Sequence, residues 1–168
     1  SGSGCHGQCV FGLPVRVESF LEYDGWYNVR LTLDPGTTPR TFDGLTLTIP
    51  MWERTDTMYV QRSDSISGNK TDRIPEGKGV VWNSSQLAFV GKDIGSFVPV
   101  AFAGSGDKGL WWFAVDMRPW TLSPDKAAVE YVRGDSGGVD LRFNFFAGKT
   151  LVDKPRPLEF AVLITPVK

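Results

Sequence analysis

Three tryptophans and two charged residues lie close together in the chain, and their side chains have the clearest binding chemistry. Trp111 and Trp112 precede Asp116 and Arg118, and Trp120 follows them. An indole ring can stack on the C–H face of a sugar, and an Asp/Arg pair can bind its hydroxyl groups through charge-assisted hydrogen bonds, which are stronger than neutral ones. These five residues therefore predict a candidate carbohydrate-binding site.

The same tryptophans also have a purely structural interpretation. Residues 110–115 are expected to form a strand, in which successive side chains point to opposite faces. Trp111 and Trp112 should then be divided, one in the core and the other exposed or at a rim. A buried tryptophan is common in β-sandwiches, so packing in the core or against a neighbouring domain is the alternative to sugar binding.

Two further tryptophans are candidates for a second aromatic platform. Trp26 follows a predicted hairpin turn and lies on the polar side of its strand, and Trp52 follows Pro50. Single exposed aromatic residues are also ordinary on protein surfaces.

Catalytic chemistry is poorly represented in the chain. His6 is the only histidine and lies in a polar terminal segment, which argues against a Ser-His-Asp triad. No phosphate-binding loop is present, and two thiols with one histidine are too few for a zinc site. No cofactor is expected, although scattered aspartates leave structural calcium as an open alternative. We therefore expect this chain not to be an enzyme.

The overall charge excludes some classes of partner. The 18 Lys and Arg residues nearly balance the 19 Asp and Glu residues, giving a net charge of −1. Such a balance provides no broad attraction to nucleic acid. No apolar run approaches the roughly 20 residues that span a bilayer as a helix. We expect neither a nucleic-acid partner nor a membrane span.

Residues 1–12 form a polar N-terminal segment that contains both cysteines of the chain, Cys5 and Cys9. We interpret the pair as a candidate disulfide, with a reactive thiol pair as the alternative. A disulfide indicates an oxidising compartment and hence a secreted, extracellular or periplasmic protein. Either a local disulfide or contact with a neighbouring copy of the chain would hold a segment that otherwise frays.

Apolar and polar residues alternate along much of residues 13–168, with the period of a half-buried strand. Turn residues separate these runs, no sustained helical period occurs, and residues 62–78 are polar and loop-like. The sequence therefore predicts one all-β domain, an antiparallel and jelly-roll-like β-sandwich of about nine or ten strands. The strand signals lie at residues 15–23, 27–33, 45–49, 58–61, 80–82, 97–102, 110–115, 129–132, 139–145 and 158–165.

Several segments, taken in order, resemble one family. They are FLEYDG (20–25), LTLTIP (45–50), FVP (97–99), GLWWFA (109–114) with Trp120, and FAVLITPVK (160–168). In that order they resemble the β-sandwich that precedes the catalytic barrel in glycoside hydrolase family 123-like proteins. The resemblance covers nearly the whole chain, from about residue 15 to residue 168.

The resemblance implies that catalysis belongs to a following (β/α)₈ barrel that acts on N-acetylgalactosaminides by a substrate-assisted route. No catalytic residue can be carried over to this chain. The family usually has an acidic residue and a serine after the GLxWF stretch, whereas this chain continues with Ala114-Val115-Asp116.

These observations favour a non-catalytic carbohydrate-binding or accessory module associated with glycan degradation, with a glycan or polysaccharide as its partner. The alternative is a structural, self-assembling extracellular subunit whose N-terminal segment contacts other copies of the chain. A free segment can do so by adding a strand to the sheet edge of a neighbour.

Overall fold

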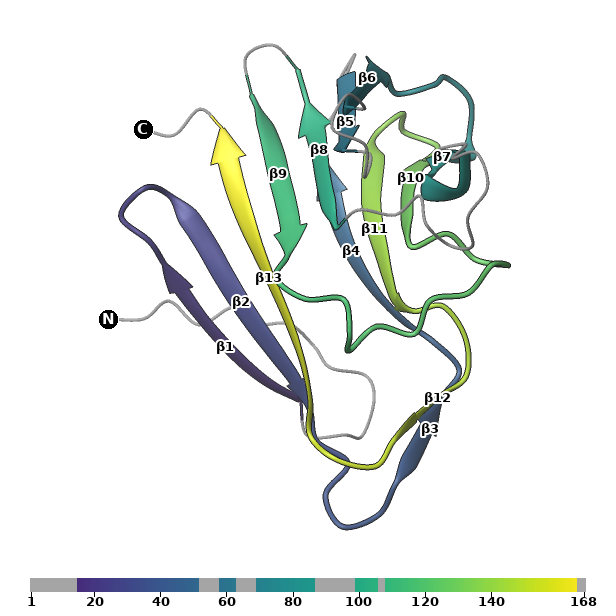
Figure 1. The fold of residues 1–168 in the computed structure, drawn as a ribbon. Helices are drawn as coiled ribbons and strands as arrows, with labels where there is room; N and C mark the ends of the chain where they lie inside the picture. The colour runs from purple at the N-terminus through teal and green to yellow at the C-terminus, as the bar shows by residue number, and fades with distance from the viewer. Residues whose placement is uncertain (1–14, 52–57, 63–68, 87–98, 106–107, 166–168) are drawn as a thin grey trace.

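The computed structural model describes residues 15–51, 58–62, 69–86, 99–105 and 108–165. Within these ranges the protein is an all-β domain of 13 strands in three sheets (Figure 1). The strands of each sheet pair antiparallel, and the helical structure among the described residues is a single 3₁₀ turn at Ser84–Gln86. The predicted all-β, sandwich-like fold is thus confirmed. None of the described residues forms a helix with the length and apolar character needed to cross a membrane.

Two sheets form the layers of the sandwich, and a short third sheet lies at one end (Figure 1). The seven-stranded sheet has the order β1 (Val15–Leu21), β2 (Trp26–Leu33), β13 (Arg156–Thr165), β9 (Gly109–Ala114), β8 (Val100–Gly104), β5 (Met58–Arg62) and β6 (Asn69–Arg73). The four-stranded sheet has the order β4 (Leu45–Met51), β11 (Val139–Phe146), β10 (Val129–Arg133) and β7 (Gly79–Asn83). The third sheet pairs β12 (Thr150–Val152) with β3 (Arg40–Phe42).

Each segment with a strand signal corresponds to a strand, and three strands were not expected. β3 and β12 have only three residues each, too few for an alternating pattern to be visible. β6 has the polar sequence NKTDR, so the interpretation of residues 62–78 as entirely loop is wrong. β6 lies at an edge of its sheet, where polar residues are tolerated. The count of nine or ten strands was therefore too low.

The core lies between the two larger sheets. Val139, Leu141 and Phe143 of β11 are all buried, in agreement with the alternation of that segment. Trp112 of β9 stacks on Phe143 with ring centroids 3.7 Å apart. The hydroxyl of Tyr131 on β10 donates a 2.7 Å hydrogen bond to the carbonyl of Phe102 on β8, which joins the two layers.

This packing divides the side chains of the seven-stranded sheet into two sets. Its inner face, which includes Trp112 and Phe160, packs on aromatic residues of β11. The side chains between them along the strands point to the opposite side, here called the outer face. Because directly paired residues share a face, the strand register determines which side chains meet there.

Candidate functional site

The two adjacent tryptophans of β9 lie on opposite faces, as alternation predicts. Trp112 has no exposed surface and is stacked on Phe143 in the core. Trp111 is half-buried on the outer face. Only Trp111 of this pair is therefore placed to contact a ligand.

Trp120 is also a core residue, with 6% of its surface exposed. Its ring meets Phe145 edge-on at a centroid distance of 4.7 Å and lies 5.9 Å from the ring of Trp112. Both indoles pack in the core of the sandwich. The prediction that Trp112 and Trp120 contact sugar is thus corrected. A sugar could reach them only if the core opened.

Asp116 and Arg118 form a local turn away from the tryptophans. The backbone N–H of Arg118 donates a 2.8 Å hydrogen bond to Asp116, and this bond holds the pKa of that carboxyl below its ordinary value. A second bond of 2.7 Å joins the Asp116 carboxylate to Arg118 Nε. Both residues line a hollow of about 420 Å³ with Lys154 and Arg156, and no described tryptophan lines it. The pair is therefore not part of one site with Trp111.

Trp26, predicted from the sequence as a separate platform, instead lies in line with Trp111. Trp26 of β2 pairs with Leu163 of β13, and Leu163 pairs with Trp111 of β9. Trp111 pairs in turn with Phe102 of β8. Neighbouring strands lie about 4.8 Å apart, so the two tryptophans are roughly 10 Å apart across the sheet.

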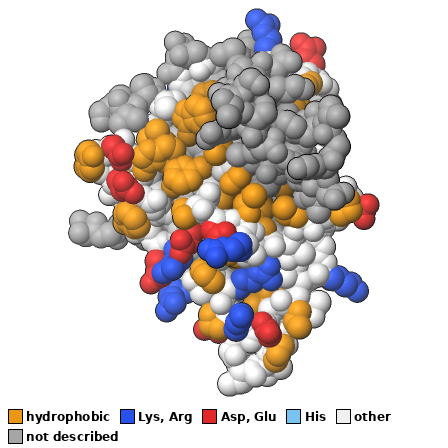
Figure 2. Space-filling model, in the orientation of Figure 1, with side chains coloured by type: hydrophobic (Ala, Val, Ile, Leu, Met, Phe, Trp, Pro, Cys, Tyr) orange, Lys and Arg blue, Asp and Glu red, His pale blue; other side chains and the backbone are white. Residues whose placement is uncertain are grey.

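Ring contacts extend this row into a continuous surface. Phe113 lies edge-on to Trp26 at 4.9 Å, and Phe102 lies 4.9 Å from Trp111. We call Trp26, Phe102, Trp111, Phe113 and Leu163 the aromatic face; all five are half-buried. Figure 2 shows hydrophobic side chains gathered over this part of β2, β13 and β9, with a group of charged side chains beside them.

Two glycines position Phe102 at one end of the aromatic face. Gly104 and Gly109 pair at the end of the β8–β9 hairpin. A Cβ on Gly109 would lie 2.4 Å from Cζ of Phe102. The ring of Phe102 therefore lies over the glycine pair, and any larger residue there would displace it.

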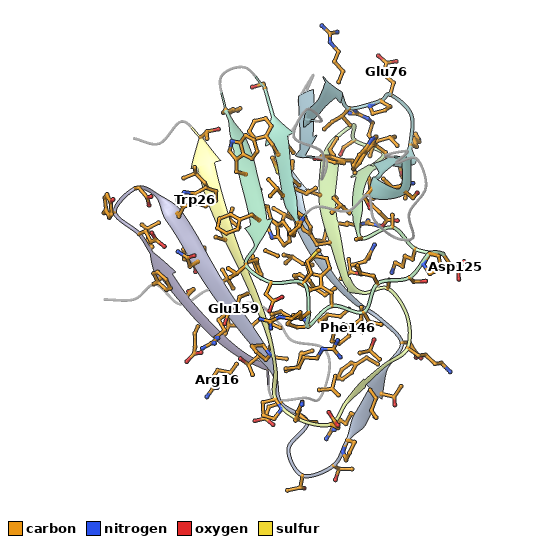
Figure 3. The ribbon with its side chains drawn as sticks, in the orientation of Figure 1. Arg16, Trp26, Glu76, Asp125, Phe146 and Glu159 are labelled. Carbon is orange, nitrogen blue, oxygen red and sulfur yellow. The ribbon has the colours of Figure 1, made fainter. Side chains whose placement is uncertain are left out.

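A groove of about 500 Å³ adjoins the aromatic face, and half of its lining residues are apolar: Phe20, Val29, Val115 and Phe160. We call it the polar groove after its other four lining residues, Glu18, Asn28, Arg30 and Glu159. Asn28 follows Trp26 on the same face of β2, and buried Ala161 lies between Asn28 and Phe113. Figure 3 labels Trp26 and Glu159, which mark the aromatic and charged parts of this surface.

Hydrogen bonds fix the polar groups of this groove. Arg30 and Glu159 form an ion pair of 2.6 Å across β2 and β13. Asn28 Nδ2 donates a 2.6 Å hydrogen bond to Glu22. The groove therefore presents oriented donors and acceptors next to an apolar surface, which is the usual composition of a small-molecule site.

Some of these residues could have been found from the sequence, and others could not. Phe113 has the same parity as Trp111 on one strand, so alternation alone puts it on the same face. Arg30 and Glu159 are 129 positions apart in the chain. Their contact depends on the pairing of β2 with β13, which no local pattern reveals.

Other predicted residues lie outside the part of the chain that the structure describes. These are Trp52, Cys5, Cys9 and the segment 1–12, so the second platform at Trp52 and the disulfide remain predictions. Among the described residues, no group of three or more His, Cys, Asp or Glu is arranged to hold a metal ion.

The fold and the site define an all-β sandwich domain with an aromatic face and a polar groove on its larger sheet. No family model, curated protein or solved structure matches the chain. The resemblance to glycoside hydrolase family 123-like proteins therefore remains an interpretation of the sequence.

Proposed function

We propose that the outer face of the seven-stranded sheet binds a carbohydrate chain and that the domain is a non-catalytic, glycan-binding accessory module. The observation that carries this proposal is the alignment of Trp26 and Trp111 across three strands, next to the polar groove. Two of the tryptophans singled out in the sequence thus share one half-exposed surface.

The aromatic face suits the apolar side of a sugar. Indole and phenyl rings offer rigid apolar area with little conformational entropy to lose. The row from Trp26 to Phe102 crosses the strands, so it favours an elongated ligand that runs from β2 towards β8. A glycan of several residues fits such a row better than a single monosaccharide does.

The polar groove suits the hydroxyl groups of the same ligand. Arg30 and Glu159 offer charged donors and acceptors, whose hydrogen bonds are about twice as strong as neutral ones. Their ion pair holds both side chains in place before a ligand arrives, which lowers the entropy cost of binding. Asn28 provides a further amide between the groove and Trp26.

The accessory role rests on the family resemblance of the sequence, in which catalysis belongs to another domain. In that arrangement this module would hold a glycan for a neighbouring hydrolase. The candidate disulfide at Cys5 and Cys9 and a glycan ligand both fit a secreted or periplasmic location.

Affinity electrophoresis in gels that contain soluble polysaccharides tests the proposal. We expect at least one polysaccharide, with N-acetylgalactosamine-containing chains among those tried, to retard the wild-type domain. Trp26→Ala and Trp111→Ala should each restore most of the free mobility. Leu151→Ala is the matched control, because Leu151 is an exposed hydrophobic residue on β12 outside the aromatic face.

Two results would contradict the proposal. One is the absence of retardation across a broad panel of neutral and amino-sugar polysaccharides. The other is retardation that persists when both Trp26 and Trp111 are replaced, because binding would then use another surface.

A further inference from the structure

β1 forms one edge of the seven-stranded sheet, and among the described strands only β2 pairs with it. It pairs with β2 from Val15 opposite Leu33 to Leu21 opposite Tyr27. No other described strand pairs with it. Figure 1 shows the β1–β2 hairpin at the side of the domain, away from the four-stranded sheet.

The hairpin turn determines which backbone groups face this edge. The N–H of Glu22 donates a 2.7 Å hydrogen bond to the carbonyl of Trp26, so Glu22 is in a hydrogen-bonded pair. Hydrogen-bonded and non-hydrogen-bonded positions alternate along an antiparallel strand. The backbone groups of Val15, Val17 and Ser19 therefore point away from β2, towards the edge.

The side chains of β1 are unusually apolar for an edge strand. Val17 and Leu21 on the inner face are 54% and 69% exposed, and Phe20 on the outer face is 62% exposed. Natural proteins usually protect an edge strand with charges, prolines, bulges or a covering segment. Exposed apolar residues on both faces of such an edge point to an interface.

The charged side chains of β1 can pair with those of a second, antiparallel copy of β1. Arg16 and Glu18 lie on the outer face, on either side of Val17, and carry opposite charges. Neither has an ion-pair partner among the described residues. If two copies of β1 pair antiparallel about an axis through Val17, Arg16 of each copy lies opposite Glu18 of the partner subunit. Opposite charges in directly facing positions stabilise a strand pair.

We propose that the protein forms a symmetric dimer in which β1 pairs antiparallel with β1 of a second copy, with the twofold axis at Val17. Val17 then exchanges backbone hydrogen bonds with Val17 of the partner subunit, and Val15 does so with Ser19 of the partner subunit. This interface uses the same surface patch on both copies, as a twofold dimer requires. A shift of the axis to Ser19 would instead set Glu18 against Phe20 of the partner subunit.

The dimer would make one continuous sheet from the two seven-stranded sheets. Both outer faces then lie on the same side, so two aromatic faces share one surface. Only this consequence rests on the proposed function: a long glycan could contact both copies and gain affinity through the second contact.

Analytical ultracentrifugation over a range of concentrations, with charge-reversal variants, tests the interface. We expect wild-type dimers, and Arg16→Glu or Glu18→Arg should raise the dimer dissociation constant at least about tenfold, because two attractive pairs become two repulsive ones. The double variant R16E/E18R restores opposite charges across the interface and should recover most of the dimer affinity, although the new positive charge at position 18 then faces Arg30 of β2 in the same chain. A wild-type protein that is monomeric at all concentrations would overturn the proposal. A dimer dissociation constant that is unchanged in all three variants would do so as well.

Cross-linking tests the register. The facing Cα atoms of a hydrogen-bonded antiparallel pair lie about 5.5 Å apart, within the range of about 4.4–6.8 Å that a disulfide bridges. In a background with Cys5→Ser and Cys9→Ser, Val17→Cys should give a disulfide-linked dimer on oxidation. Ser19→Cys is the matched control and should remain unlinked, and the reverse result would exclude an axis at Val17.

Glycan binding provides an independent measurement on the same variants. Arg16→Glu monomers should still bind a short glycan through the aromatic face, so loss of the dimer and loss of the proposed function are distinguishable.

Discussion

At the residue scale, Trp111 and Trp112 show how strand geometry gives adjacent identical residues different roles. Trp112 is enclosed by aromatic rings of the core, including Phe143 at 3.7 Å and Phe160 at 6.0 Å. Trp111 belongs to the aromatic face and is half-buried. The same substitution at the two positions should therefore have opposite effects on stability and on binding.

Trp112→Ala should lower the free energy of unfolding by about 3–5 kcal/mol, the usual cost of removing a large buried aromatic side chain. Trp111→Ala should retain a cooperative unfolding transition close to that of the wild type and lose glycan retardation. Urea denaturation and affinity electrophoresis on both variants check this. A variant pair with equal losses of stability would contradict the assignment of Trp111 to a surface role.

Asp116 gives a prediction about pH. The hydrogen bond from the backbone N–H of Arg118, aided by the Arg118 side chain, keeps its folded-state pKa below the ordinary value of 3.8. A depressed pKa means that the carboxylate stabilises the fold above the ordinary value and loses this effect as the pH falls through the folded-state pKa. The stability difference between wild type and Asp116→Asn should therefore be constant near neutral pH and shrink in acid. Denaturation series at several pH values measure it, and a difference that persists in strong acid would contradict this account.

At the residue scale, the sequence pattern identifies part of the candidate site. It singles out Trp26 and Trp111, which lie on the aromatic face, together with Trp112 and Trp120, which do not. Alternation separates Trp111 from Trp112 but does not say which of them faces the second sheet. Trp120 follows the strand in a turn, where no periodicity applies, so its burial depends on contacts with Phe145 that only the fold determines.

At the scale of elements, the β8–β9 hairpin depends on its closing glycines. A Cβ on Gly104 would lie 2.4 Å from the Cα of Gly109 and 2.6 Å from the carbonyl oxygen of Lys108. Backbone atoms cannot move aside as a side chain can, so the strands would have to separate. At Gly109 the closest atoms belong to the movable ring of Phe102, although the Cα of Gly104 is also only 2.9 Å away.

Gly104→Ala should therefore cost more stability than Gly109→Ala, about 1–3 kcal/mol for an overpacked site of this kind. Gly109→Ala should chiefly displace Phe102 from Trp111 and weaken glycan binding. Gly148→Ala is the matched control, because a Cβ there meets no atom within 4 Å. Thermal unfolding and affinity electrophoresis measure the two effects, and the reverse order of stability would contradict the account.

The sequence predicts where strands lie better than it predicts which strands pair. The alternation of apolar and polar residues locates β2 and β13 in the sequence, although Tyr27 and Ile164 on the inner face are exposed. It gives no information on their pairing, which joins the first part of the chain to its last strand. The groove and the aromatic face both depend on that pairing, so the sequence alone could not assemble them. The alternating pattern does not predict β3 and β12, because each of these strands has only three residues.

At the scale of the whole molecule, the sandwich buries the inner face of the central strands β13, β9 and β8, and it leaves the aromatic face half-buried. Besides apolar packing, the Tyr131 hydroxyl reaches across the layers to the Phe102 carbonyl at 2.7 Å. Phe102 also belongs to the aromatic face, through its contact with Trp111. The core and the proposed binding surface thus share one strand, β8.

Tyr131→Phe removes this bond without changing the shape of the ring. We expect a loss of about 1 kcal/mol in the free energy of unfolding, the typical net contribution of one hydrogen bond. Chemical denaturation measures it. A stability unchanged from wild type would show that the bond between the layers contributes nothing measurable.

The tryptophan indole N–H signals in a ¹H–¹⁵N spectrum give the most direct test of the proposed binding face. Each signal can be assigned by replacing one tryptophan at a time with phenylalanine. On titration with a polysaccharide that retards the domain, the signals of Trp26 and Trp111 should shift progressively, while those of the buried Trp82, Trp112 and Trp120 remain in place. Unchanged Trp26 and Trp111 signals at a saturating polysaccharide concentration would contradict the assignment of this face to glycan binding.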